Sequence, residues 1–238
     1  MHLAPIFTLQ LDFSGVYDEE IFRPEGAVRI SLTDLRGTEC YCDPDSAEEI
    51  RRRIAEAVSA RSGEASGDRA FPIHWIDGGD YHYASHFWLE RIGRPFCLVL
   101  IDHHPDDQSG AFGGDLLSCG GWVADARRDL PALRWTFWIN GPGQALRLPD
   151  LPVYLSIDKD VLSKEYASTN WDQGSMTLAQ LKDTVRAIAA QREILGIDVC
   201  GELSAAKGAV ARDYAINRAT NLELQDFFVS LQTKQSLV

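Results

Sequence analysis

Two short acidic segments carry the residues of this chain that are best suited to chemistry. The first places Asp102, His104 and Asp106 at alternate positions. The second places Asp158 and Asp160 in the same way. Alternate residues of an extended chain point to the same side, so the two segments can present four carboxylates and one imidazole to a common point. Carboxylates this close repel one another unless cations lie between them, which predicts a pair of divalent metal ions.

The chemical type of these ligands narrows the choice of metal. Carboxylate and imidazole groups without a thiolate favour manganese, iron or zinc over calcium or magnesium. A buried cluster of unpaired carboxylates is otherwise costly, so a metal explains the cluster better than a structural role does.

Apolar runs precede both acidic segments and must position them. Their β-branched and aromatic residues and their short length predict strands. Because the apolarity is continuous rather than alternating, these strands are expected in a parallel sheet that helices cover on both faces, which is an α/β fold. The apolar runs are 71–76, 96–101, 135–139, 153–157 and 194–199. Two earlier runs, 6–11 and 27–32, predict strands at one edge of the sheet.

Helices are predicted between the strands. Ser46 begins a capping-box pattern ahead of 50–60, and Thr177 is a suitable N-cap for 178–192. Residues 82–92 and 221–232 are further candidates. No Pro-, Ser- or Gly-rich linker divides the chain, which predicts a single domain over residues 1–238.

Aspartates lie at or near the ends of four predicted strands, at positions 77, 102, 158 and 198. A single aspartate in such a place is ordinarily a turn or cap residue. In open parallel sheets, however, function lies at the carboxyl ends of the strands. Four such aspartates therefore predict a site at this edge of the sheet.

Composition excludes several classes of function. The net charge of −12 argues against nucleic acid and suits a cationic substrate, although solubility alone also explains it. No apolar stretch approaches a membrane span, and the N-terminus lacks the pattern of a signal peptide. Five cysteines, an odd number, favour free thiols. We therefore expect a cytoplasmic protein with no membrane or nucleic-acid partner; a homo-oligomer is compatible with the sequence.

Three segments in fixed order, 78–82, 102–106 and 156–160, resemble the arginase/agmatinase family, the ureohydrolases. The family pattern is Gly-Gly-Asp-His, then Asp-x-His-x-Asp, then Ser-x-Asp-x-Asp. The resemblance covers roughly residues 70 to 202. It implies a three-layer αβα sandwich with a mainly parallel sheet, as in arginases and deacetylases, and two Mn²⁺ ions per chain. The metal ligands it implies are His82, Asp102, His104, Asp106, Asp158 and Asp160.

His82 departs from the family pattern by one position, because Tyr81 stands where the family has its histidine. A one-residue slip in a loop restores the ligand, and His86 is a weaker candidate. The resemblance also implies the reaction: a metal-bound hydroxide attacks the guanidinium carbon, Asp106 carries the proton to the leaving amine, and urea is released.

Substrate contacts are expected from residues that follow the later strands. Glu202 is the candidate for binding the guanidinium and for catalysis, with Asp198 as a supporting carboxylate. Trp171 and Asp172 are expected to line the mouth of the site. The structural alternatives are an exposed loop carboxylate for Glu202 and a loop anchor for Trp171.

The segment 113–122 contains no histidine, although enzymes of this family that act on free arginine carry one there, and no clamp for a free amino acid is recognisable. These losses resemble the compact peptide arginases, which convert arginine to ornithine within peptides. The expected partner is thus an arginyl peptide. The alternatives are a small-molecule arginase, agmatinase or formiminoglutamase, another metal-dependent C–N amidohydrolase, and a non-catalytic binding protein.

Overall fold

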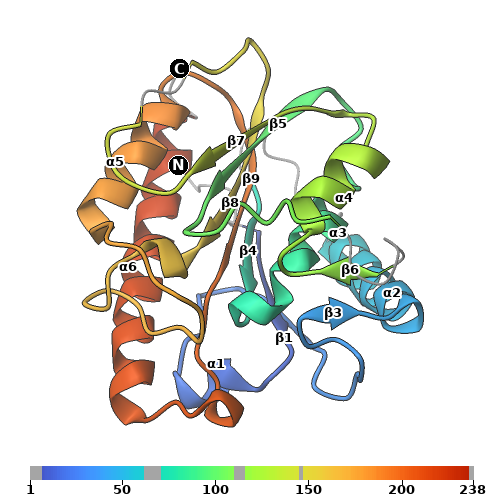
Figure 1. The fold of residues 1–238 in the computed structure, drawn as a ribbon, viewed down its shortest axis with the longest axis vertical. Helices are drawn as coiled ribbons and strands as arrows, with labels where there is room; N and C mark the ends of the chain where they lie inside the picture. The colour runs from blue at the N-terminus through green and yellow to red at the C-terminus, as the bar shows by residue number, and fades with distance from the viewer. Residues whose placement is uncertain (1–6, 62–70, 110–115, 145–146, 236–238) are drawn as a thin grey trace.

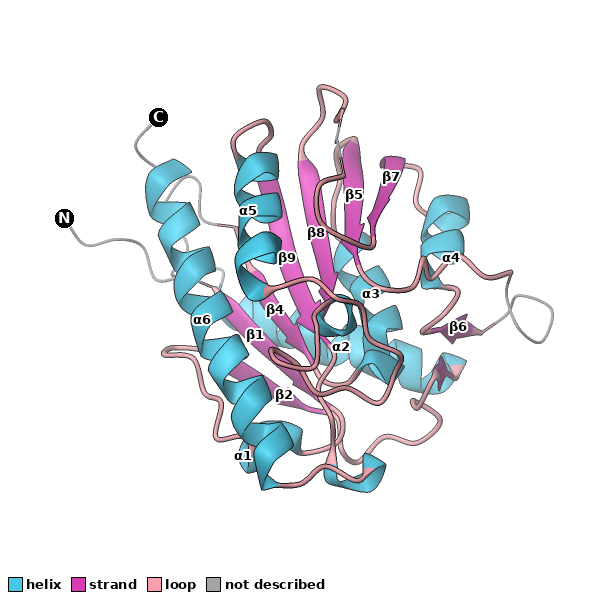
Figure 2. Cartoon of the chain, turned by 60° about the vertical axis from the view of Figure 1, so that its left-hand side comes forward, coloured by secondary structure: helices cyan, strands magenta, loops and turns pink. Residues whose placement is uncertain are grey.

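A seven-stranded sheet, parallel throughout, forms the middle layer of the protein (Figures 1 and 2). The computed structural model describes residues 7–61, 71–109, 116–144 and 147–235. The strands lie in the order β2-β1-β4-β9-β8-β5-β7. They are β1 (Thr8–Asp12), β2 (Val28–Ser31), β4 (Ile73–Ile76), β5 (Phe96–Ile101), β7 (Leu133–Ile139), β8 (Val153–Asp158) and β9 (Ile194–Cys200). All seven overlap the predicted runs, and the predicted α/β fold is confirmed.

Helices cover both faces of the sheet. The apolar residues of α1, α5 and α6 pack on one face, and those of α2, α3 and α4 pack on the other. The helices are α1 (Val16–Glu19), α2 (Pro44–Arg61), α3 (Ser85–Leu89), α4 (Trp122–Asp129), α5 (Leu178–Ala189) and α6 (Ala211–Gln235). Short 3₁₀ turns are η1 (Gly79–Ala84), η3 (Lys159–Val161) and η4 (Ala205–Lys207). A separate antiparallel pair joins β3 (Tyr41–Cys42) to β6 (Leu117–Ser118).

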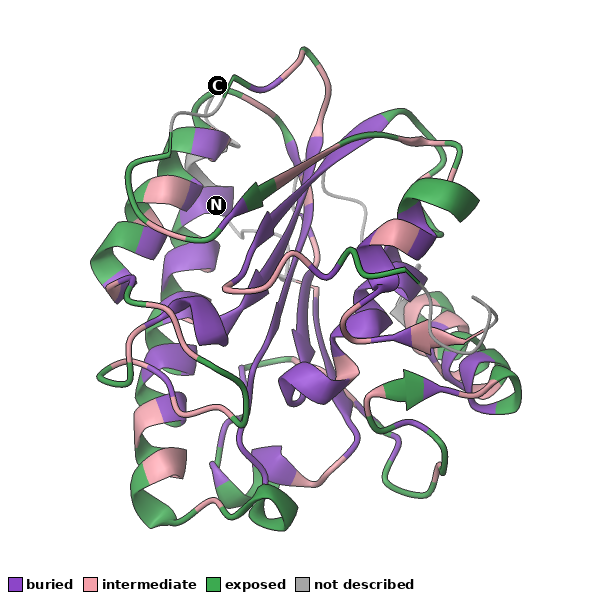
Figure 3. Ribbon diagram, viewed as in Figure 1, coloured by how far each residue is buried: buried purple, intermediate pink, exposed green. Residues whose placement is uncertain are grey.

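Burial follows from the sequence pattern. Every residue of β5 and β8 is buried, as continuous apolarity predicts for central strands (Figure 3). β7 is an edge strand, and Trp135 on it is 58% exposed. The helix α5 begins with a full capping box between Thr177 and Gln180, and its apolar stripe is buried.

Two helix predictions differ from the structure. Residues 82–92 do not form one helix, because η1 turns the chain before α3 begins at Ser85. The C-terminal helix starts at Ala211, ten residues before the predicted start at 221. None of the helices in the described parts of the chain is both long and apolar enough to cross a membrane.

Candidate metal centre

The carboxyl ends of β5 and β8 lie side by side, with Ile101 paired to Ile157. Asp102 comes directly after β5, and Asp158 is the last residue of β8. Because parallel strands end at the same edge, the two carboxylates meet there. The 3₁₀ turn after β4 brings a histidine, His82, to the same place.

His82 faces three carboxylates. Its Nδ1 lies 2.9 Å from Asp106 Oδ2, 3.2 Å from Asp102 Oδ2 and 3.7 Å from Asp158 Oδ2. The one-residue displacement of His82 in the sequence is therefore absorbed by η1. The alternative, His86, lies elsewhere: its Nδ1 is 2.9 Å from Glu90 Oε1.

A second group of ligands adjoins the first. His104 Nδ1 lies 2.8 Å from Asp160 Oδ2 and 3.8 Å from Asp102 Oδ1. Asp102 thus contributes one carboxylate oxygen to each group. The structure brings all six predicted ligand residues together: Asp102 joins the group of His82 and Asp106 to that of His104 and Asp160, and Asp158 lies beside His82 in a third group.

The electrostatics of the cluster suit bound cations. Asp102, Asp158 and Asp160 are each no more than 3% exposed. Burial, together with the charge of Asp106, raises the pKa of Asp102 well above its usual value, and burial with Asp160 raises the pKa of Asp158 to about 7. Asp102 Oδ2 accepts no hydrogen bond from the described residues. Such a set is stable in its ionised form only if positive charge lies among the carboxylates, so a pair of divalent ions fits.

Asp106 is held in an unusual backbone conformation. Its φ is +47°, in the left-handed region that residues with a side chain rarely adopt. The indole Nε1 of Trp122 donates a 2.8 Å hydrogen bond to Asp106 Oδ2, and the amide of Val123 donates to its carbonyl. The start of α4 therefore fixes this carboxylate, a contact that the sequence pattern did not reveal. Strain of this kind is commonly kept at functional sites.

The far side of His82 contacts a hydroxyl and a carboxylate. Ser156 Oγ lies 2.9 Å from His82 Nε2 and donates a 2.6 Å hydrogen bond to Asp198 Oδ1. Since the serine proton goes to Asp198, Ser156 accepts from Nε2–H and leaves Nδ1 facing the carboxylates. Burial raises the pKa of Asp198 to about 6. Asp198, predicted to support guanidinium binding, thus lies behind His82 and orients it instead.

Of the four strand-end aspartates, Asp77 has a structural role. Its carboxylate accepts hydrogen bonds from the amides of Phe13, Ser14 and Gly78. It therefore holds together the chain segments that follow β1 and β4. The expectation that all four aspartates form one site is wrong for Asp77, which acts as the turn residue that a single strand-end aspartate ordinarily is.

A cavity of about 340 Å³ is lined in part by the candidate metal ligands. Trp171 forms one wall, where its Nε1 donates to Asp80 Oδ1 and its ring lies edge-on to His104. Trp171 is 40% exposed, so it stands at the mouth, where it was predicted. Asp172 is exposed and is not among the described residues that line the cavity. Cavity walls also come from Cys40, Tyr41, Gln108, Ser109, Ser118, Cys119 and Gly120. Part of the segment expected to hold a proton shuttle, residues 113–115, lies outside the described residues.

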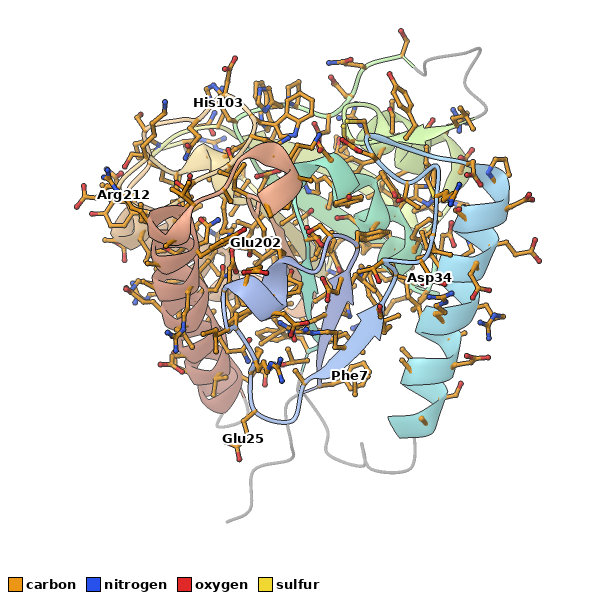
Figure 4. The ribbon with its side chains drawn as sticks, turned by 90° about the horizontal axis from the view of Figure 1, so that it is seen from below. Phe7, Glu25, Asp34, His103, Glu202 and Arg212 are labelled. Atoms are coloured by element: carbon orange, nitrogen blue, oxygen red, sulfur yellow. The ribbon has the colours of Figure 1, made fainter. Side chains whose placement is uncertain are left out.

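Glu202 does not line this cavity among the described residues. Its Oε2 lies 2.6 Å from Lys159 Nζ, and Asn221 Nδ2 donates to its Oε1. Both charged side chains are fully buried. Figure 4 shows Glu202 apart from His103, which adjoins the metal ligands. The geometry therefore gives Glu202 an ion-pair role under α6 and does not support the predicted contact with a guanidinium.

A second carboxyl group adjoins this ion pair. Glu20 is 1% exposed and accepts a hydrogen bond from Asn221 Nδ2. Burial, and next the negative charge of Glu202, raise the pKa of Glu20 to about 10. Glu20 is thus protonated near neutral pH, beside the buried ion pair of Glu202 and Lys159.

Replacing Glu20 with glutamine is expected to stabilise the protein at alkaline pH. The folded pKa of Glu20 is raised from its usual 4.5 to about 10, so the folded state binds the extra proton and stability falls as pH rises through this window. Glutamine removes that loss, for an expected gain of about 1–2 kcal/mol at pH 8. Urea unfolding between pH 5 and 9 measures it, with the exposed neighbour Glu19→Gln as control. Parallel pH profiles for wild type and Glu20→Gln would contradict the assignment.

Comparisons with known proteins agree with the fold. No sequence model of a known protein family matches the chain. An uncharacterised protein of Thermotoga maritima is 28% identical over 207 residues, which are 81% of this chain and 78% of that protein. Among solved structures, proclavaminate amidino hydrolase from Streptomyces clavuligerus superposes with a TM-score of 0.64, at 13% identity, over 98% of this chain and 93% of its own.

Other solved structures give the same result. Arginase from Medicago truncatula has a TM-score of 0.61 at 16% identity, over 97% of this chain and 88% of its own. Formimidoylglutamase from Bacillus subtilis has a TM-score of 0.59 at 11% identity, over 98% of this chain and 89% of its own. These neighbours are ureohydrolases, and the predicted arginase-like three-layer fold is confirmed.

Proposed function

We propose that this protein is a binuclear metal-dependent hydrolase that cleaves a guanidinium group into urea and an amine. The observation that carries the proposal is the pair of adjoining ligand groups that share Asp102 at the carboxyl ends of β5 and β8. Divalent ions held there would supply a hydroxide at neutral pH and would polarise the substrate. Mixed carboxylate and imidazole ligands suit manganese, which is the metal we propose for reconstitution.

The chain's own residues divide the remaining tasks. Asp106 is positioned by Trp122 and lines the cavity, so it is the group that takes a proton and passes it to the leaving amine. His82 is held in its tautomer by Ser156, and Trp171 offers an aromatic wall to a planar cation.

The lining of the cavity favours a substrate without a free carboxylate next to the reacting end. Among the described residues that line it there is no lysine or arginine. A cation is the strongest partner for the carboxylate of a free amino acid, whereas an arginine side chain within a peptide brings no such carboxylate to the site. We therefore propose an arginyl peptide as substrate, with ornithine as the residue produced.

Urea release by the Mn²⁺-reconstituted protein tests this function. An arginine-containing peptide is compared with free arginine and with agmatine at equal concentration. Urea from the peptide alone is the expected result. A better rate on a free guanidine would point to a small-molecule ureohydrolase, and no urea from any of the three, with metal bound, would contradict the proposed reaction.

Replacing Trp171 with leucine is expected to raise the KM for the guanidinium substrate about tenfold and to leave kcat nearly unchanged. A cation stacked on an indole gains about 0.5–2 kcal/mol, and an interaction equal in ground and transition states affects KM alone. Trp135→Leu is the matched control, because Trp135 is exposed on β7 and away from the cavity. An unchanged KM in Trp171→Leu, with metal content intact, would remove Trp171 from the substrate site.

A further inference from the structure

A buried thiol adjoins the metal ligands, although the sequence pattern assigned none to the site. Cys200 is the last residue of β9 and pairs with Asp158 at the end of β8. It is 0% exposed. Its Sγ lies 3.1 Å from Asp158 Oδ2. The ligand atoms of His82, Asp158 and Cys200 all lie within 4.8 Å of one another.

These distances suit one ion. Donor atoms bound to the same metal at about 2.0–2.3 Å are themselves separated by about 3–4 Å. Asp158 Oδ2 meets this condition with both Cys200 Sγ, at 3.1 Å, and His82 Nδ1, at 3.7 Å. A second observation points to a ligand: Asp102 Oδ2, on a residue 1% exposed, faces His82 and accepts no hydrogen bond from the described residues.

We propose that the sulfur of Cys200 is a ligand of the ion held by His82, which makes the two metal positions chemically different. The proposal rests on the proposed metal centre and deepens it. One position then offers nitrogen, oxygen and sulfur, while the position at Asp102, His104 and Asp160 offers nitrogen and oxygen alone. Binding forms one metal–sulfur bond and releases the thiol proton to solvent.

The difference predicts selectivity between the positions. Sulfur donors favour zinc, iron(II) and cobalt(II), whereas carboxylate-rich sites accept manganese. The centre is therefore suited to a mixed pair, with the softer ion beside Cys200 and manganese beside His104. A protein loaded with two Mn²⁺ ions is expected to release one of them at a lower Zn²⁺ concentration than the other.

Cobalt(II) added to the metal-free full-length protein tests the ligand directly. A sulfur-to-cobalt charge-transfer band in the near ultraviolet is expected in the wild type. It is lost in Cys200→Ser while cobalt remains bound. Cys97→Ser is the matched control, because Cys97 is equally buried but lies on β5 at the end opposite the site. That variant keeps the band.

Each other outcome has a definite reading. Bound cobalt without the band in the wild type overturns the proposal, and so does a band that persists in Cys200→Ser. The proposal can be overturned even if Cys200→Ser fails to fold, because the absence of the charge-transfer band in cobalt-loaded wild-type protein is sufficient. If the wild type binds neither cobalt nor manganese, both this proposal and the proposed metal centre are overturned. The number of metal ions per chain distinguishes that outcome from loss of the sulfur ligand alone.

Discussion

Replacing Asp158 with asparagine is expected to prevent formation of the metal centre and to lower urea release by at least about 1000-fold. Asp158 Oδ2 faces His82 and Cys200, and Oδ1 accepts the amide of Asp160, so one carboxylate joins the ligand groups and shapes the turn that follows. A neutral amide is a poor ligand for a divalent ion. Loss of about 4 kcal/mol of metal-dependent stabilisation corresponds to this decrease in rate.

The measurement pairs metal content per chain with the rate of urea release. Asp172→Asn is the control, because Asp172 is an exposed aspartate of the loop ahead of α5 and is not among the described cavity residues. It should keep both the metal and the activity. Two metal ions and full activity in Asp158→Asn would contradict the proposed binuclear centre.

Replacing Lys159 with methionine is expected to destabilise the fold by about 3–5 kcal/mol, the usual cost of breaking a buried ion pair from one side. Lys159 Nζ lies 2.6 Å from Glu202 Oε2 and donates to Asn221 Oδ1, and none of its side chain is exposed. Without the ammonium, the negative charge of Glu202 is left buried beside Glu20. We expect the melting temperature to fall by about 10 °C.

Two further variants identify the cause. Lys182→Met removes a surface ion pair with Glu223 and should cost less than about 1 kcal/mol. Adding Glu202→Gln to Lys159→Met should recover part of the lost stability, because the unpaired charge is then gone. Thermal unfolding of the four proteins measures both effects. A loss below about 1 kcal/mol in Lys159→Met would show that the buried pair contributes little.

Much of the layout could be predicted from the sequence because it depends on local pattern. The run 96–101 has the bounds of β5, and Thr177 caps α5 as its neighbours predict. The position of the two acidic segments in the sequence predicted that Asp102 and Asp158 meet, since Asp102 directly follows β5 and Asp158 ends β8, two neighbouring central strands. The motif order pointed to the ureohydrolase fold that the structure has.

The contacts that the sequence did not reveal are side-chain contacts between separate elements of the fold. Glu202 was assigned to the substrate because it follows β9, yet its partner is Lys159, which lies between Asp158 and Asp160 in the chain. Cys200 reaches the site only through the register that sets it opposite Asp158. Trp122 reaches Asp106 because α4 packs under that turn. These contacts depend on strand order, strand register and helix packing, which cannot be predicted from a single sequence.

The position of β9 has a consequence for the order in which the protein can fold during synthesis. β9 is the last of the described strands, yet it lies between β4 and β8 and joins β2-β1-β4 to β8-β5-β7. The two three-stranded parts therefore cannot close into one sheet until residues 194–200 leave the ribosome. His82 follows β4, whereas Asp102 follows β5 and Asp158 ends β8. The complete ligand set thus forms late, in a slow step that non-local strand pairing governs, and a nascent chain cannot assemble the full centre early.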